Sequence, residues 1–394
     1  MIPAKEFIQN APGKGKNDFM KEYSEKYRID TEENRSFLEE VQKDLLNFGH
    51  QFPSPGGSSY YLGDDGTPWK DRNRETWITS RMVHVYCLGL FLGHPGSGEL
   101  ADAGLKGLRG ELHDTEHGGW YAGLTADGNI VPTKQCYAHA FVILAASSAL
   151  LAGRPGAKEL LDEALALYDL RFWNEEEGLS CDTWNTGFTV LDDYRGLNAN
   201  MHTVEAFLAA ADVTGDEKYR VRAGRIIDHV SGWAKQNQWR IPEHFTKDWI
   251  PDLECNREKP DDPFKPYGAT PGHGIEWARL IVQWALSTWG GPGGEAGRYL
   301  TIAENLYNRA VQDAWKATAL LESCTPRTGT ESRWFMTECT GRWQRRSIPL
   351  RFCTMSPGRS SMQKITRNLC SIWMRRSSIM STAPGSISWT AKTV

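Results

Sequence analysis

Hydrophobic and polar positions alternate with a helical period over most of the chain. Apolar side chains recur at positions i, i+3, i+4 and i+7 within segments that Gly-rich turns separate. Strand signals are few and short. The pattern predicts an all-α fold with helices at 33–50, 74–92, 99–112, 133–152, 157–172, 198–213, 216–236, 273–286 and 296–315.

The turns between these segments predict how the helices are joined. GHPGSGE, GRPGAKE and TGDEKY each place Gly where one helix ends and an acidic residue where the next begins. The spacing of the segments is too loose for a solenoid repeat. We therefore expect a closed arrangement of helical hairpins.

Composition excludes several classes of partner. A net charge of -4 gives no general attraction to nucleic acid or to an anionic membrane. The chain has neither a signal-like N-terminus nor an apolar run of about 18 residues, so we expect a cytoplasmic protein. Its eight Cys residues form no CxxC pair, which favours free thiols over a zinc site or a disulfide framework.

The segment TWITSRMVHVYCLG places Trp77, Arg81 and His84 on one helix face, at i, i+4 and i+7. An Arg among apolar neighbours is costly unless it is paired. From the residues alone, a salt bridge between Arg81 and a carboxylate of another helix is the favoured interpretation, and a binding site is the alternative. We interpret His84 as a hydrogen-bonded core histidine.

Two further helix starts carry a His-x-x-Glu set. Asn198, His202 and Glu205 share one face of a predicted helix, and His273 and Glu276 lie in the first turn of another. Two such sets suggest a polar floor in an apolar helical assembly. The alternative is that both histidines are buried and capped by the glutamates for structure alone. Di-metal helical bundles use the opposite order, Glu-x-x-His, so we predict no metal site.

Six motifs in order resemble one family. WITSRMVHVY, GGWYAG, KQCYAHAF, NANMHTVEAF, EHF and YGATPGHGIEWARL are similar to the N-acylglucosamine 2-epimerase superfamily, and most closely to its aldose–ketose isomerase branch of mannose and sulfoquinovose isomerases. The resemblance runs from about residue 32 to about residue 315. It implies an (α/α)6 barrel that isomerises a small sugar without a metal or an organic cofactor, and it leaves the oligomeric state open.

The resemblance also implies which residues bind the sugar. Trp77 would form a wall of the site, and Arg81 would contact the substrate oxygens at the carbonyl end. Tyr137 and Asn198 would donate or accept hydrogen bonds with sugar hydroxyls. Lys265, in DPFKPYG, is a candidate cation for a sulfonate if the substrate carries one.

Three residues would supply the acid–base chemistry. The resemblance implies that His202 assists ring opening and that His273 with Glu276 forms one half of the proton-transfer machinery. Moving a proton between C1 and C2 of an open-chain sugar passes through an enediolate. That step needs a base active near neutral pH and a fixed cation or donor beside the developing negative oxygen.

The chain changes character after Lys316. From Leu321 to the end it holds ten Arg, two Lys and three Glu, with no Asp, His or Tyr. The family's second histidine, in a Trp-Phe-His-Gln-type motif, and a Trp and a Glu from an earlier C-terminal helix do not follow Trp315. A shifted codon phase allows HDRMHWTVAEAINTAAVLYHVTG at 335–358 and, in the same phase, HEHGSWFHQLDRKNR at 379–394. We therefore interpret the tail as a frameshift product.

This interpretation divides the chain into three parts. They are a polar N-terminal extension at 1–31, an incomplete (α/α)6-barrel sugar isomerase domain at 32–316 and a disordered out-of-frame tail at 317–394. By lineage we expect an aldose–ketose isomerase of the mannose/fructose type, inactive and poorly folded as written.

Other functions remain open from the sequence. A 2-epimerase of N-acylglucosamine or of a free sugar would use the same two-histidine logic, returning the proton to C2 instead of delivering it to C1. A helical-barrel glycoside hydrolase would need two carboxylates across the scissile bond, for which Asp192, Asp193 and Glu276 are candidates. A non-catalytic sugar-binding protein with an Arg-rich tail is the remaining alternative.

Overall fold

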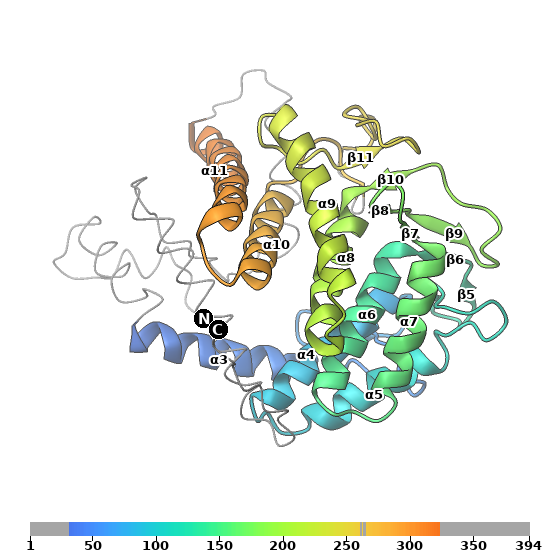
Figure 1. Cartoon of the computed structure of the whole chain (residues 1–394). Coiled ribbons are helices and arrows are strands. Elements are labelled where there is room, and N and C mark those ends of the chain that lie inside the picture. The colour runs from blue at the N-terminus through green and yellow to red at the C-terminus, as the bar shows by residue number, and fades with distance from the viewer. Residues whose placement is uncertain (1–30, 261, 263–264, 324–394) are drawn as a thin grey trace, which may run out of the picture. The chain divides into compact units, whose positions relative to one another are not determined.

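The computed structural model describes residues 31–260, 262 and 265–323 (Figure 1). Contacts group the described residues from Val41 onward into one compact unit. From residue 324 onward, the predicted out-of-frame tail lies outside the described residues, as does the N-terminal extension up to residue 30. The predicted domain boundaries therefore stay predictions.

Within the described residues, an α-helix is present at each of the predicted positions. The helices are α3 (Glu32–Phe48), α4 (Thr76–Phe91), α5 (Ser97–Arg109), α6 (Cys136–Leu151), α7 (Ala157–Arg171), α8 (Leu197–Thr214), α9 (Glu217–Gln236), α10 (Pro271–Trp289) and α11 (Gly294–Ser323), with a short 3-10 turn η1 (Gly49–Gln51). The all-α prediction is confirmed, and α11 runs beyond its predicted end at 315. None of these helices is long and apolar enough to cross a membrane.

Consecutive helices pair as antiparallel hairpins. α4 packs on α5, α6 on α7, α8 on α9 and α10 on α11, while α4 contacts α6, α6 contacts α8, and α8 contacts α10. The four even-numbered helices therefore form an inner row, with the odd-numbered partners outside (Figure 1). Most residues of α6 and α8 are buried, as expected for helices that are apolar on all sides.

The described strands are only two or three residues long. They are β1 (Tyr61–Leu62), β2 (Pro68–Trp69), β3 (Arg74–Glu75), β4 (Gly123–Leu124), β5 (Ile130–Val131), β6 (Thr133–Gln135), β7 (Trp173–Asn174), β8 (Leu179–Ser180), β9 (Thr183–Asn185), β10 (Arg195–Gly196) and β11 (His244–Phe245). β3, β6 and β10 lead directly into α4, α6 and α8. They pair antiparallel with β4, β9 and β11, so the loops that carry these strands hold the N-terminal ends of the inner helices.

Local capping explains where several helices begin and end. α8 ends at Gly215, whose φ of 72° is a left-handed conformation that costs glycine little, and whose N–H donates to Ala211 O. The next residue, Asp216, caps α9 by accepting the N–H of Lys218. The turn TGDEKY therefore behaves as its sequence predicts. α10 begins with Pro271 at its first position, where the missing N–H costs nothing.

A buried ion pair fixes the loop between α5 and β4. The ammonium of Lys134 is fully buried and donates to Asp114 Oδ2 at 2.6 Å and to Gly118 O. Beside it, His139 Nε2 accepts the backbone N–H of Trp120 at 3.1 Å. Burial lowers the pKa of His139 to about 3, so this imidazole is neutral and structural. Removing either member of the buried ion pair would leave an uncompensated charge.

Candidate active site

The predicted site residues occupy equivalent places on the inner helices. Trp77, Tyr137 and Asn198 are each the second residue of α4, α6 and α8, and His273 is the third residue of α10. We call these four the first-turn residues. One turn further lie Arg81, Phe141 and His202, which we call the second-turn residues. Because the helices start at the same end of the inner row, the positive ends of their dipoles face this site, which favours a developing negative charge.

Arg81 lies among aromatic rings. Its guanidinium is 4.3 Å from the ring centroid of Phe141 and 5.1 Å from that of Trp77, and it donates to the Tyr137 hydroxyl at 3.3 Å. Among the described residues no Asp or Glu forms an ion pair with it, so the expected interhelical salt bridge is not found there. The Arg charge is thus placed beside rings and a hydroxyl, where it remains a strong donor for an anionic oxygen.

The Tyr137 ring connects α4 to α8. It packs edge-on against Trp77 at 5.9 Å and against His202 at 5.2 Å. Burial raises the pKa of Tyr137, the charge of Arg81 lowers it, and Glu276 and Glu205 raise it further. The phenol is therefore protonated at neutral pH and can donate a hydrogen bond.

His202 is almost fully buried and paired with a carboxylate. Its Nδ1 lies 3.2 Å from Glu205 Oε2, one turn along α8, and its ring packs against Phe141 at 4.5 Å. Burial by itself would raise the pKa of Glu205, but the hydrogen bond from His202 and the charge of Arg279 outweigh it and lower the pKa to about 2. Glu205 is thus a permanent anion behind His202.

Arg279 connects α10 to this pair. Its guanidinium donates to Glu205 Oε1 at 2.8 Å and lies 3.6 Å from Glu276 Oε1. His202, Glu205 and Glu276 bring ligand-type atoms within 4.8 Å of one another, close enough to hold a metal ion. However, Arg279 already supplies a cation to both carboxylates, so a divalent ion would have to displace it or sit beside a like charge.

The carboxylate that contacts His273 is that of Glu243, and not that of Glu276, which the sequence suggests. His273 Nδ1 lies 2.9 Å from Glu243 Oε2, and the other oxygen of Glu243 accepts the N–H of Thr270 at 3.1 Å. Glu276 lies one turn along the same helix, and its carboxylate forms an ion pair with the guanidinium of Arg279. In the sequence, Glu243 is part of the EHF motif, and no role is predicted for it there. Glu243 lies next to β11, which pairs with β10, the strand that leads into α8. The periodicity of the sequence does not reveal this contact between distant segments.

The remaining candidate residues have other contacts. Lys265 Nζ lies 3.6 Å from the ring centroid of Tyr194, so its charge is engaged there. Asp192 and Asp193 are exposed on the loop before β10. Asp192 caps its own loop by accepting the N–H of Tyr194 at 3.0 Å. His84 is hydrogen-bonded as predicted, with its Nδ1 2.6 Å from the Ser148 hydroxyl on α6, but it is half-buried and does not lie in the core.

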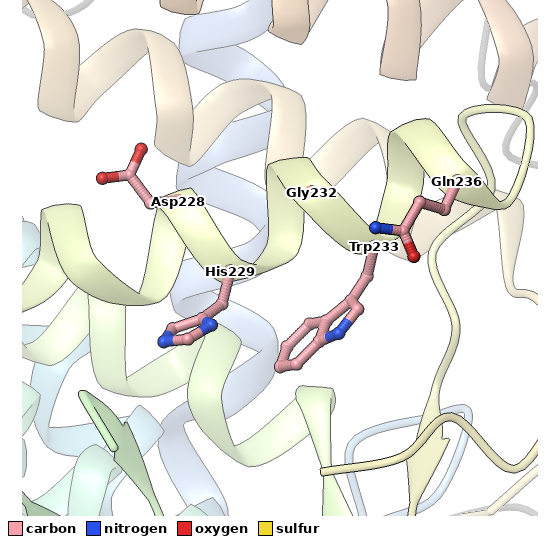
Figure 2. Close-up of a pocket in the computed structure, with 5 residues that line it drawn as sticks. All are labelled: Asp228, His229, Gly232, Trp233 and Gln236. Atoms are coloured by element: carbon pink, nitrogen blue, oxygen red, sulfur yellow. The ribbon is translucent and has the colours of Figure 1, made fainter. Parts of the chain in front are cut away.

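Two surface cavities lie on outer helices. One, of about 330 Å³, is lined by Asp228, His229, Gly232, Trp233 and Gln236 of α9 (Figure 2). His229 and Trp233 point to the same side of the helix there, with their rings stacked at 5.3 Å. The other, of about 550 Å³, lies on α5 and the turn at Pro155. Neither is lined by a first-turn or second-turn residue, so neither is part of the candidate active site.

The chain is similar to a family of known proteins over most of its length. The N-acylglucosamine 2-epimerase (GlcNAc 2-epimerase) family profile matches residues 56–340. A D-mannose isomerase of Thermobifida fusca is 42% identical over 283 residues, which make up 71% of this chain and 69% of the relative. A crystal structure of D-mannose isomerase superposes with a TM-score of 0.64 at 29% identity and 71% coverage of both chains.

The fold is shared more widely than the sequence. A cellobiose 2-epimerase from Spirochaeta thermophila DSM 6192 has a TM-score of 0.60 at 18% identity, with 72% of each chain covered. These likenesses confirm the predicted (α/α)6 architecture and the predicted isomerase lineage. Because the family profile spans well over half of its length, the chain belongs to the N-acylglucosamine 2-epimerase family.

Proposed function

We propose that the active form of this protein interconverts an aldose and its ketose, of the mannose–fructose type. The proposal rests on one observation. Two histidine–carboxylate pairs and one Arg lie at the N-terminal ends of the inner helices, where the helix dipoles are positive. His202 pairs with Glu205 and His273 with Glu243, and Arg81 lies among aromatic rings. The 42% identity to a protein named D-mannose isomerase supports this choice of substrate class.

The proposed roles follow from the position of each side chain. Trp77 stacks against the sugar, Arg81 holds the oxygens at its carbonyl end, and Tyr137 and Asn198 bind hydroxyls. His202 moves the proton that opens the ring. The open aldose then has a carbonyl at C1 and an acidic hydrogen on C2.

Proton transfer between the two carbons is the central step. A base removes the hydrogen from C2, and the electron pair forms the C1–C2 double bond of an enediolate while negative charge moves to O1. The proton is returned to C1, and the proton of the O2 hydroxyl passes to the negative O1 as the C2 carbonyl forms, so that C1 becomes the CH₂OH group of the ketose. We assign His273, assisted by Glu276, to this transfer, and Arg81 with the helix dipoles to the negative oxygen.

A 2-epimerase is the second candidate. It would use the same residues and return the proton to C2 from the opposite face. The likeness to a cellobiose 2-epimerase at 18% identity concerns the fold alone, so it does not favour this outcome. Product analysis separates the two, because an isomerase yields a ketose and an epimerase yields another aldose.

The test uses D-mannose with excess EDTA. We expect ketose to form when the reading frame after Lys316 is restored, because protein side chains supply the acid–base chemistry. Formation of another aldose instead would establish the epimerase. Complete and reversible loss of activity on metal removal would contradict the proposed mechanism and favour a metal held by His202, Glu205 and Glu276. For the chain as written, we expect no turnover, since the family's second histidine is missing from it.

A further inference from the structure

We infer that Glu243 is the positioning residue of His273, and that it fixes which nitrogen of the imidazole carries the proton. This inference rests on the proposed function and adds a residue to which no role has been given. Glu243 is nearly inaccessible, with a side chain 4% exposed, and it contacts His273 from a segment 30 positions away in the sequence.

The carboxylate is held from two sides. One oxygen accepts the backbone N–H of Thr270, the N-cap of α10, at 3.1 Å. The other lies 2.9 Å from His273 Nδ1. The backbone of Glu243 is fixed as well, because its carbonyl accepts the N–H of Leu197 at the start of α8. Glu243 therefore ties the starts of two inner helices to the imidazole.

This arrangement selects one tautomer. An ionised carboxylate can only accept hydrogen bonds, so Nδ1 must be the protonated nitrogen when His273 is neutral. The lone pair then resides on Nε2, and a base acting on the C2 hydrogen needs such a lone pair. Glu276 cannot replace Glu243 in this role, because it is brought to the guanidinium of Arg279.

The two-sided contact makes Glu243→Gln an unusually informative substitution. Glutamine offers one oxygen and one NH₂ group. The backbone N–H of Thr270 can only donate, so it binds the side-chain oxygen of the glutamine. The NH₂ group of the glutamine then faces His273. Nδ1 must then accept, which moves the imidazole proton to Nε2 and removes the lone pair that the base requires. A change in charge alone would leave the tautomer unaltered.

The experiment is proton–nitrogen correlation NMR of the full-length chain with ¹⁵N-labelled histidine, at alkaline pH. The His273 signal is assigned by its absence from His273→Asn. We expect a protonated Nδ1 in the wild-type protein, a protonated Nε2 in Glu243→Gln, and the wild-type pattern in Glu276→Gln, the matched control on α10. In a chain that turns over mannose, Glu243→Gln should lower kcat by about 100-fold or more with little change in KM.

The inference is overturned if wild-type His273 carries its proton on Nε2, or if Glu276→Gln, and not Glu243→Gln, inverts the tautomer. The wild-type spectrum decides the matter even if Glu243→Gln does not fold. None of these readings requires turnover. Failure of the frame-restored chain to isomerise any aldose would therefore refute the proposed function and leave the tautomer result intact.

Discussion

His202 and His273 differ in what surrounds them, and this separates their proposed roles. His202 is packed between the rings of Tyr137 and Phe141, with Glu205 behind it. His273 lies in the first turn of α10 with a side chain 23% exposed. A histidine held among rings suits the single proton movement that opens a sugar ring, and a more accessible one suits repeated transfer between two carbons.

This difference predicts unequal effects of removing the two imidazoles. In a frame-restored, active chain, His273→Ala should abolish turnover of every form of the sugar. His202→Ala should regain part of its rate with an analogue that cannot cyclise, because ring opening is then unnecessary. The rates of both variants on both substrates test this, with far-ultraviolet circular dichroism as the control for folding. Equal rates on the analogue would show that the roles are wrongly assigned.

Glu205 should make a pH-dependent contribution to stability. The pKa of Glu205 lies at about 2 in the folded protein and near its ordinary value of 4.5 in the unfolded chain, so the stabilising effect is complete above about pH 4.5 and is lost as the pH falls toward 2. The shift in pKa corresponds to stabilisation on the order of 3 kcal/mol. Glu205→Gln should therefore destabilise the protein at pH 7, and the deficit should shrink at pH 3.

Thermal or urea unfolding of Glu205→Gln at the two pH values measures this difference. The matched control is Glu254→Gln, whose partner Arg257 forms an ion pair in which both side chains are more than 60% exposed. Such exposed ion pairs contribute little to the free energy of unfolding. An equal loss of stability in both variants, or a Glu205→Gln deficit that persists unchanged at pH 3, would contradict the assignment.

The residues that sequence reasoning brought together are those that share a helix. Trp77 with Arg81, and Asn198 with His202, follow from spacing of four alone. The pairs that complete the site join distant segments: Arg279 meets Glu205 across 74 positions. Helical periodicity defines a face but not the neighbour that covers it, so Glu243 and Arg279 could not be predicted.

At the scale of the elements, close helix packing depends on one glycine of α9. A Cβ on Gly224 would lie 2.4 Å from Trp284 Cζ2 of α10. Trp284 also donates its Nε1–H to Arg220 O and packs edge-on against Tyr299 of α11 at 4.7 Å. The indole is thus fixed between three helices and cannot move aside at small cost.

Two glycines of the same helix should consequently respond in opposite ways to alanine. Gly224→Ala should destabilise the protein by about 1 to 3 kcal/mol through overpacking. Gly232 lies further along α9, at the surface cavity in Figure 2, and a Cβ there would meet nothing within 4 Å. Gly232→Ala should stabilise by about 0.5 to 1 kcal/mol, because alanine has the better helix propensity.

The unfolding midpoints of the two variants, compared with that of the wild type, measure both changes in stability. A stabilising Gly224→Ala would mean that Trp284 does not pack as described. The positions of α9 and its neighbours were predictable, because periodicity and turn residues are local. That Gly224 serves as a packing site was not, since the sequence does not show which face of α9 meets α10.

At the scale of the whole molecule, the described hairpins are fewer than the six that an (α/α)6 barrel contains. Within residues 31–260, 262 and 265–323 the inner row consists of α4, α6, α8 and α10. The relation to the family could be predicted because most of its motifs lie on these helices or directly before them. The predicted out-of-frame residues after Ser323 lie outside the described part.

The frameshift interpretation can be tested with three forms of the chain. The first is the chain as written, and the second ends after Ser323. In the third, the reading frame is restored from the codons between Lys316 and Leu321. If the tail is out of frame, removing 324–394 should leave the circular dichroism and the thermal midpoint of the chain as written unchanged. The restored chain should unfold at a higher temperature and more cooperatively, because added inner helices bury apolar faces at about 25 cal/mol per Å². It alone should isomerise mannose. A clear loss of stability on trimming, or mannose isomerase activity in the chain as written, would show that the C-terminal sequence is a functional part of this protein.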